Sequence, residues 1–256
     1  MHNKVTNKHN NILEVKLNSL ELKRESNYSL LFEHINFEVN SNSIYCLVGK
    51  NGIGKTTLLN ALLNLLDEKI YRVKGNILID GINPFSCDSA NLILLRHKIV
   101  KYIFQDALSS FDPLKKINYY FKDYTNSAQL DELLDYFILP KKETVLNYYP
   151  FQLSGGMAQR LAIILGIISK PKLLILDEPN SAVDIPISNL LSKKLIDFSR
   201  ANQSSVLIVT QDINFALNTT DKIGLLTQHG ITEFSTNRDN TTEIKTTLLN
   251  ALLLSE

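Results

Sequence analysis

Residues 43–59 read SIYCLVGKNGIGKTTLL, and this stretch decides the fold. An apolar, β-rich run leads into a glycine-containing loop, and a leucine-rich helical segment follows. A phosphate-binding P-loop requires this order, because loop N–H groups and a helix N-terminus then point at phosphate oxygens. The residues expected around the phosphates are Gly49, Lys50, Asn51, Gly52, Ile53, Gly54, Lys55, Thr56 and Thr57.

Two side chains of this loop carry its chemistry. Lys55 is expected to reach the β- and γ-phosphates, and the Thr56 hydroxyl is expected to ligate Mg²⁺. A flexible surface loop with the same letters is the alternative. The strand and helix patterns on either side argue against it.

Composition is that of an ordinary soluble globular domain: 256 residues, 44% hydrophobic and 21% charged. The net charge of +1 gives no electrostatic indication of a nucleic-acid partner. Cys46 and Cys87 are too few for a disulfide framework or metal cluster, and are expected to be plain thiols. A polar N-terminus and the lack of an apolar run of membrane-spanning length predict a cytoplasmic protein that does not span the membrane.

The order of the predicted elements indicates an α/β fold with a mostly parallel sheet, because continuous apolar strands alternate with helices. Strands are predicted at 12–22 and 31–39, separated by a polar turn at 23–29, and later at 75–81, 99–104, 173–177, 206–210 and 223–227. Helices are predicted at 55–66, 90–97, 186–201 and 243–254. Apolar residues recur at helical spacing between 106 and 170, so this segment is predicted to be an inserted helical subdomain.

A second motif places two carboxylates at the end of an apolar strand. Asp177 closes the strand and Glu178 follows, at the sheet edge where ligands bind in open α/β folds. In a P-loop protein the first carboxylate holds Mg²⁺, usually through water, and the second orients the attacking water or accepts its proton. An acidic turn after a buried strand is the simpler alternative.

A third motif, residues 153–160, reads LSGGMAQR. A serine N-cap followed by two glycines forms an anion-binding helix start, or otherwise a mere turn. The motif resembles the LSGGQ signature of ATP-binding cassette (ABC) ATPases, with Met157 in place of the usual Gln. The resemblance implies that Ser154, Gly155 and Gly156 contact the nucleotide held by a partner subunit.

Further residues match this family's motifs. Gln105 resembles the Q-loop glutamine, which senses the γ-phosphate, helps to hold Mg²⁺ and contacts the membrane partner, and residues 181–184 (SAVD) resemble the D-loop. Tyr28 is a candidate for the aromatic residue that stacks on adenine, or an exposed turn residue. The switch histidine is replaced by Gln211, which can donate a hydrogen bond but cannot carry a charge. Slow hydrolysis is expected, unless a hydrogen bond from Gln211 to the γ-phosphate is enough for normal turnover.

The resemblance covers nearly the whole chain and implies one ABC ATPase domain over 1–256. Residues 1–105 and 171–256 would form the RecA-like core with an antiparallel β subdomain, and 106–170 the helical subdomain. FQD, SSFDP and YPFQLSGGM, within 104–157, look most like the oligopeptide/nickel importer group.

This group implies an ATP- and Mg²⁺-dependent ATP hydrolase at the cytoplasmic face of the membrane. It would pair with a second ATPase subunit, a heterodimer being favoured over a homodimer, and drive import of a peptide, nickel or metal chelate through integral membrane permease subunits. A groove near Phe111 and residues 119–121 would receive a permease helix, unless these aromatic residues are core. A non-transport ABC ATPase and a poorly hydrolysing regulatory subunit are the alternatives.

Overall fold

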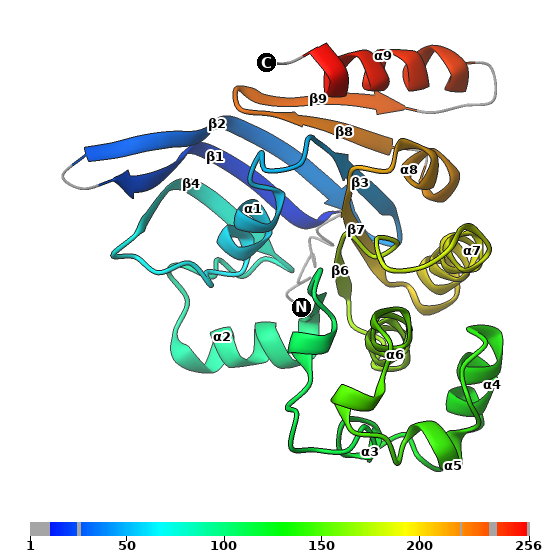
Figure 1. Ribbon diagram of the computed structural model, residues 1–256. Coiled ribbons are helices and arrows are strands. Elements are labelled where there is room, and N and C mark those ends of the chain that lie inside the picture. Colours follow the sequence, from blue (N-terminus) through cyan, green and yellow to red (C-terminus); the bar gives the residue numbers. More distant parts are fainter. Residues whose placement is uncertain (1–10, 25–26, 221, 236–239, 255–256) are drawn as a thin grey trace, which may run out of the picture.

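The computed structural model describes residues 11–24, 27–220, 222–235 and 240–254, and contains two sheets (Figure 1). An antiparallel three-stranded sheet has the order β2-β1-β4, with β1 at Asn11–Arg24, β2 at Asn27–Asn40 and β4 at Tyr71–Ile79. The second sheet has the order β5-β6-β7-β3-β8-β9. Its strands are β3 (Ile44–Val48), β5 (Val100–Ile103), β6 (Leu173–Asp177), β7 (Ser205–Thr210), β8 (Lys222–Thr227) and β9 (Gly230–Ser235).

The second sheet is parallel except for β9, which pairs antiparallel with β8. Its central strands are buried on both faces, which explains their unbroken apolar runs. In β3, for example, Cys46 and Val48 belong to one core and Tyr45 and Leu47 to the other. The predicted fold class, α/β with a mostly parallel sheet and an antiparallel β subdomain, is therefore confirmed.

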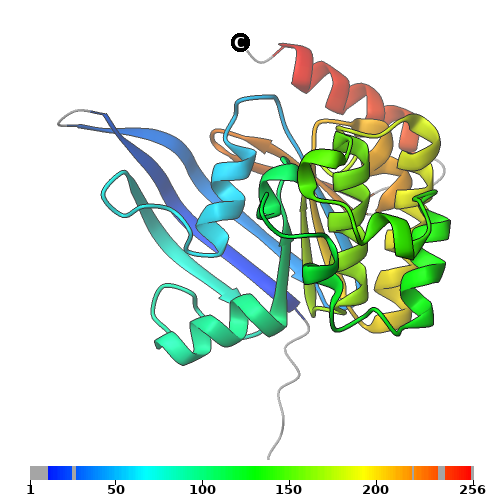
Figure 2. The same cartoon turned by 60° about the horizontal axis from the view of Figure 1, so that its bottom comes forward.

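Helices cover the parallel sheet. They include α1 (Lys55–Leu62), α6 (Gly155–Ile168), α7 (Ile185–Asn202), α8 (Ile213–Thr219) and α9 (Thr241–Leu254). Figures 1 and 2 show the helical region, coloured green, on the side of the molecule away from the β2-β1-β4 sheet. It holds η2 (Leu108–Ser110), α3 (Asn118–Phe121), α4 (Ala128–Tyr136), α5 (Lys142–Val145), η3 (Pro150–Gln152) and α6.

The aromatic residues of the helical region divide between core and surface. Phe111 and Phe121 are buried, so for these two the core interpretation is correct. Tyr120 packs partly against the same core, whereas Tyr119 is 51% exposed. Of the four aromatic residues predicted to line the groove, only Tyr119 is therefore exposed.

Several predicted boundaries are wrong. β2 begins within the predicted turn, β4 begins before Gly75, and a π-helix, η1 (Leu95–Ile99), follows α2 (Ser89–Leu94). Gly75 is not a strand end but part of an irregular step in the β1–β4 register: its φ is +139°, and a Cβ there would lie 2.3 Å from the Lys16 carbonyl oxygen. Strand β9 was missed because an edge strand with half-buried side chains has only a weak apolar alternation.

Two sequence predictions fall on residues outside the described part. The polar N-terminus, residues 1–10, lies there, and so do residues 25 and 26 of the predicted turn. Among the described residues, every helix is too short or too polar to cross a membrane.

Candidate functional site

The P-loop runs from the end of β3 to the start of α1. Gly54 is the N-cap of α1 and has φ +105°, a conformation that favours glycine. A Cβ on Gly54 would also approach the Phe32 ring to 3.1 Å. Backbone conformation and packing therefore both require glycine here, and they fix the loop against β2.

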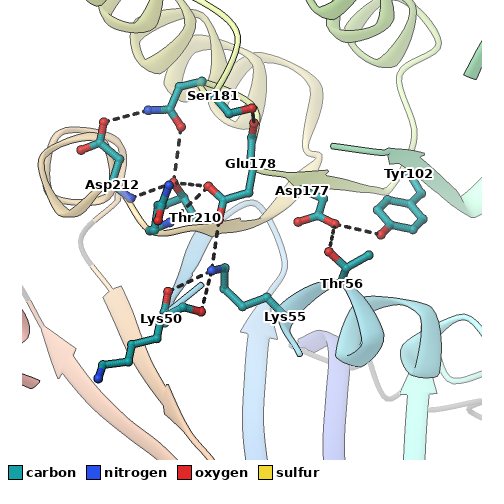
Figure 3. A network of polar contacts seen from close by, with 12 residues as sticks. Lys50, Lys55, Thr56, Tyr102, Asp177, Glu178, Ser181, Thr210 and Asp212 are labelled. Carbon is teal, nitrogen blue, oxygen red and sulfur yellow. Dashed lines mark hydrogen bonds and ion pairs between the residues drawn. The ribbon is translucent and has the colours of Figure 1, made fainter. Parts of the chain in front are cut away.

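The Lys55 ammonium is held at the loop by three oxygens (Figure 3). It donates to the carbonyl oxygens of Gly49 at 2.9 Å and Lys50 at 3.0 Å, and forms an ion pair with Glu178 Oε1 at 3.1 Å. The side chains of Lys55 and Glu178 are each only 7% exposed. The predicted phosphate ligand and the predicted base are thus brought together.

Asp177 is fully buried at the end of β6. Its Oδ2 accepts hydrogen bonds from the Thr56 hydroxyl at 2.7 Å and the Tyr102 hydroxyl at 3.4 Å. Burial raises the pKa of this carboxyl, and the charge of Glu178 adds to the effect, while the Thr56 hydrogen bond opposes it. Burial, with the charge and hydrogen bond of Asp177, also raises the pKa of Tyr102.

The second carboxylate oxygen of Asp177, Oδ1, is buried and has no hydrogen-bond partner among the described residues. An anionic oxygen without a donor, beside a threonine hydroxyl, fits a hard cation such as Mg²⁺ or its bound water. The described residues contain no cluster of three His, Cys, Asp or Glu side chains that would hold a metal alone. Magnesium usually needs only one or two carboxylates when substrate phosphates complete its shell.

Glu178 is positioned by its own backbone and by β7. Its φ of +48° lies in the left-handed region, and its N–H donates to the Val209 carbonyl at 2.8 Å. Its Oε2 accepts from the Thr210 hydroxyl and the Gln211 backbone N–H, both at 3.2 Å. A carboxylate fixed in this way can orient a water or accept its proton.

A second row of contacts supports this carboxylate. The Thr210 hydroxyl lies 3.3 Å from Asn180 Oδ1, and the Asn180 amide donates to Asp212 Oδ2 at 2.8 Å. Gln211 enters the network through its backbone, while its side chain is exposed. The sequence analysis did not predict roles for Thr210 and Asn180. The only sequence feature that could have indicated them is that each lies next to a motif residue.

The signature residues lie at the start of α6. Ser154 caps the helix by accepting from the Met157 N–H at 3.2 Å, as predicted for a serine N-cap. Ser154 and Gly155 are exposed, whereas a Cβ on Gly156 would lie 2.9 Å from the Ala182 carbonyl oxygen. The signature is therefore packed against residues 181–184 and leaves its first two residues accessible.

Gln105 is exposed just beyond β5. Ile103 of β5 pairs with Leu176 of β6, so Gln105 follows at the same sheet edge as Asp177 and Glu178. The carboxyl ends of parallel strands meet at one edge, where ligands bind in open α/β folds, and the role of Gln105 there stays a prediction.

Tyr28, the predicted adenine-stacking residue, contacts β4 and lines a different cavity from the one beside the P-loop. Tyr28 lies in β2 opposite Lys23, and the Arg72 guanidinium of β4 covers its ring at 3.9 Å. Arg72 thus holds the ring against β4, where it lines a cavity with Phe85 and Glu68.

The cavity beside the P-loop has a different lining. Its volume is about 820 Å³, and its walls come from residues 50–53, from Leu30 and Leu31 of β2, and from Ala251 and Leu252 of α9. This space is large enough for the nucleoside part of a nucleotide. Aliphatic side chains make up much of its lining, together with Arg24, Gln228 and the imidazole of His229.

The fold and the site together define a P-loop ATPase that carries a second anion-binding helix start. Residues 32–181 match the ABC transporter family, which is 150 of the 256 residues. The chain belongs to the ABC transporter family. It is an ABC-type ATP hydrolase, which confirms the predicted enzyme class.

Curated relatives confirm the resemblance to the oligopeptide group. The chain is 27% identical over 226 residues to the oligopeptide transport ATP-binding protein OppD of Lactococcus lactis subsp. cremoris, an alignment that covers 84% of this chain and 67% of that protein. It is 28% identical over 218 residues to the metal-staphylopine import system ATP-binding protein CntD of Staphylococcus aureus, covering 79% of this chain and 80% of that one.

Solved structures share the fold. The ATP-binding cassette MJ0796, in a dimeric post-hydrolysis state bound to ADP and Pi, superimposes with a TM-score of 0.73 at 23% identity, over 87% of this chain and 98% of that chain. The fold class predicted from the sequence is therefore found in a known ATP-binding cassette.

Proposed function

We propose that this chain is the ATP-binding subunit of an importer for a peptide, nickel or a metal chelate. It would couple ATP binding and hydrolysis at a dimer interface to a separate membrane permease, at the cytoplasmic face of the membrane. The names of the relatives support the substrate class, because they include oligopeptide transport and metal-staphylopine import proteins.

The observation that carries the proposal is that, among the described residues, the P-loop contacts and the exposed signature residues of one chain share no hydrogen bond or ion pair. Lys55 pairs with Glu178 and Thr56 donates to Asp177, and none of the contacts drawn in Figure 3 involves Ser154 or Gly155. Ser154 and Gly155 instead present an exposed helix start, which would bind the phosphates of a nucleotide held by a second subunit.

The neighbourhood of the D-loop supports such an interface. Ile185 follows Asp184, the N-cap of α7, and is 78% exposed. An isoleucine exposed to this extent beside the signature contact would be buried in a dimer. Closure of two such surfaces around ATP would exclude water and fix the γ-phosphate.

Each residue of the network has a proposed role in hydrolysis. Lys55 would bind the phosphates, Thr56 and Asp177 would hold Mg²⁺, and Glu178 would orient the attacking water. Magnesium, when bound, neutralises the charge that develops on the phosphate oxygens. Gln105 would contact both the nucleotide and the permease.

The segment after β5 is the proposed contact with the permease. Phe104 is 40% exposed and Leu114 86% exposed, and both lie close to Gln105 in the chain. Exposed apolar side chains next to a nucleotide-sensing residue suit a partner whose position depends on the nucleotide.

The experiment that tests this function is purification of the chain together with its membrane fraction. We expect a stable complex with a polytopic permease, whose ATP hydrolysis rises when the transported substrate is added. A chain that binds ATP but remains alone, with no membrane protein retained under mild detergent, would contradict the transport role.

Gln211 bears on the proposed pairing of subunits. A glutamine side chain cannot carry the charge of the usual histidine, so we propose a heterodimer in which a second ATPase supplies the complete site. Gln211→His should then raise hydrolysis of the complex, while the exposed Gln203→His should not. If Gln211→His lowers the rate and the wild-type chain alone is a fast homodimeric ATPase, the heterodimer proposal is wrong.

A further inference from the structure

We propose that Tyr102 is a positioning residue for the magnesium complex: its hydroxyl holds Asp177 Oδ2 and so keeps Oδ1 free for the cation or its bound water. The inference rests on the proposed role of Thr56 and Asp177. It adds a residue that none of the sequence motifs contains, and it gives β5 a part in binding the metal.

The register of two strands brings Tyr102 to this carboxylate. β5 and β6 run parallel, with Tyr102 opposite Ile175, so Asp177 lies two residues further along the neighbouring strand. The Tyr102 hydroxyl spans this offset and reaches Oδ2 at 3.4 Å. Figure 3 shows the tyrosine and Thr56 meeting Asp177 from different elements.

The tyrosine ring is itself fixed. Tyr102 packs against the core that contains α1, and its ring centroid lies 4.2 Å from that of Phe104 at an interplanar angle of 43°. A tyrosine has few rotatable bonds, so little entropy is lost when its hydroxyl is held at one place. The hydroxyl is therefore a rigid donor to the carboxylate.

Two donors on one oxygen have a specific consequence. The terminal torsion of an aspartate is broad, so a carboxylate with one donor can turn about its Cβ–Cγ bond. Thr56 donates to Oδ2 from α1 and Tyr102 donates to the same oxygen from β5. Oδ1 is left without a partner among the described residues.

Of the two donors to Asp177 Oδ2, Tyr102 is the one that is not expected to bind the metal. If the Thr56 oxygen binds Mg²⁺, the Thr56 hydroxyl is shared between the metal and Asp177. Tyr102 belongs to the sheet and does not contact the P-loop in the network of Figure 3. The tyrosine would therefore keep Asp177 oriented once the Thr56 oxygen is engaged by the metal.

The test is the magnesium dependence of nucleotide binding, measured by calorimetry with a non-hydrolysable ATP analogue on the full chain. Tyr102→Phe keeps the ring and removes only the hydroxyl. We expect the magnesium concentration for half-maximal enhancement to rise about 3- to 10-fold, the range expected for the net contribution of one typical intramolecular hydrogen bond. Affinity in EDTA should stay unchanged, because Lys55 and the loop bind the phosphates without the metal.

Tyr136→Phe is the matched control. Its hydroxyl also makes one hydrogen bond, to the Leu190 carbonyl at 3.0 Å, in a different part of the fold. It should leave the magnesium midpoint unchanged. In an Asp177→Asn background, Tyr102→Phe should add no further shift.

The outcomes separate this inference from the function on which it rests. Wild-type protein that binds the analogue equally with and without magnesium overturns the role of Asp177, and this inference with it. If magnesium enhances analogue binding in the wild type and Tyr102→Phe has the same magnesium midpoint, this inference alone is overturned. Equal losses of affinity in magnesium and in EDTA would also overturn it, since they would mean that the hydroxyl supports only the structure.

Discussion

Substitution of two adjacent glycines allows the steric contact between the signature and the D-loop to be measured as a difference in stability. A Cβ at Gly156 would lie 2.9 Å from the Ala182 carbonyl oxygen, whereas a Cβ at Gly155 has no neighbour within 4 Å. Both residues lie in the first turn of α6, so glycine-to-alanine substitution should improve helix propensity at each by up to about 1 kcal/mol. The difference between the two variants therefore isolates the steric contact.

We expect Gly156→Ala to be less stable than Gly155→Ala by about 1–3 kcal/mol, the usual cost of overpacking against atoms that cannot rotate away. For a chain of this size each kcal/mol shifts the melting temperature by about 2–4 °C. Calorimetry of the nucleotide-free proteins should show Gly155→Ala at or above the wild-type melting temperature and Gly156→Ala clearly below Gly155→Ala. Equal melting temperatures would refute the proposed packing of Gly156 on the D-loop.

Three further predictions concern the nucleotide site. Lys55→Ala should weaken ATP binding at least about tenfold because it removes a charge from the phosphates, while the exposed Lys141→Ala should not; equal affinities by calorimetry would argue against the P-loop assignment. Glu178→Gln should slow hydrolysis by about 10²–10⁴-fold in the assembled transporter, and an unchanged rate would remove the catalytic role of this carboxylate. Burial raises the pKa of Asp177 in the folded state above the value of about 3.9 expected in the unfolded chain. As the pH rises above that value, ionisation of Asp177 therefore lowers the free energy of unfolding of the wild type. The stability of Asp177→Asn relative to wild type should thus be greater at pH 7 than at pH 4. A difference in melting temperature that is the same at both pH values would contradict this reasoning.

The fold and the main site residues were accessible from the sequence because each motif sits on a strand or helix end with strong local signals. Lys55 follows an apolar strand and begins a helix, and Asp177 closes a fully buried strand, so both are placed by their own neighbours. The parallel sheet follows from strands such as β3 and β6, whose side chains are buried on both faces.

What was missed depends on pairing between distant segments. Tyr102 fits the apolar pattern of β5 as well as a phenylalanine would, and only the register with β6 gives its hydroxyl a role. The surroundings of Tyr28 also depend on distant pairing, because the guanidinium that covers its ring comes from Arg72 of β4. The contact of Gly156 with Ala182 likewise joins the start of α6 to the D-loop, two segments that no local pattern connects.

The strand order also determines when each strand can pair during synthesis of the chain. Ile44 of the P-loop strand β3 pairs with Val206 of β7, 162 residues later, and its other neighbour, β8, is made later still. At ribosomal speeds of about 5–20 residues per second, β3 waits roughly 10–30 s for its first partner. The β2-β1-β4 sheet, by contrast, has all its strands once Ile79 is made. An apolar strand thus stays unpaired on the nascent chain, and a chaperone that shields residues 44–48 during this interval would protect the future nucleotide site from aggregation.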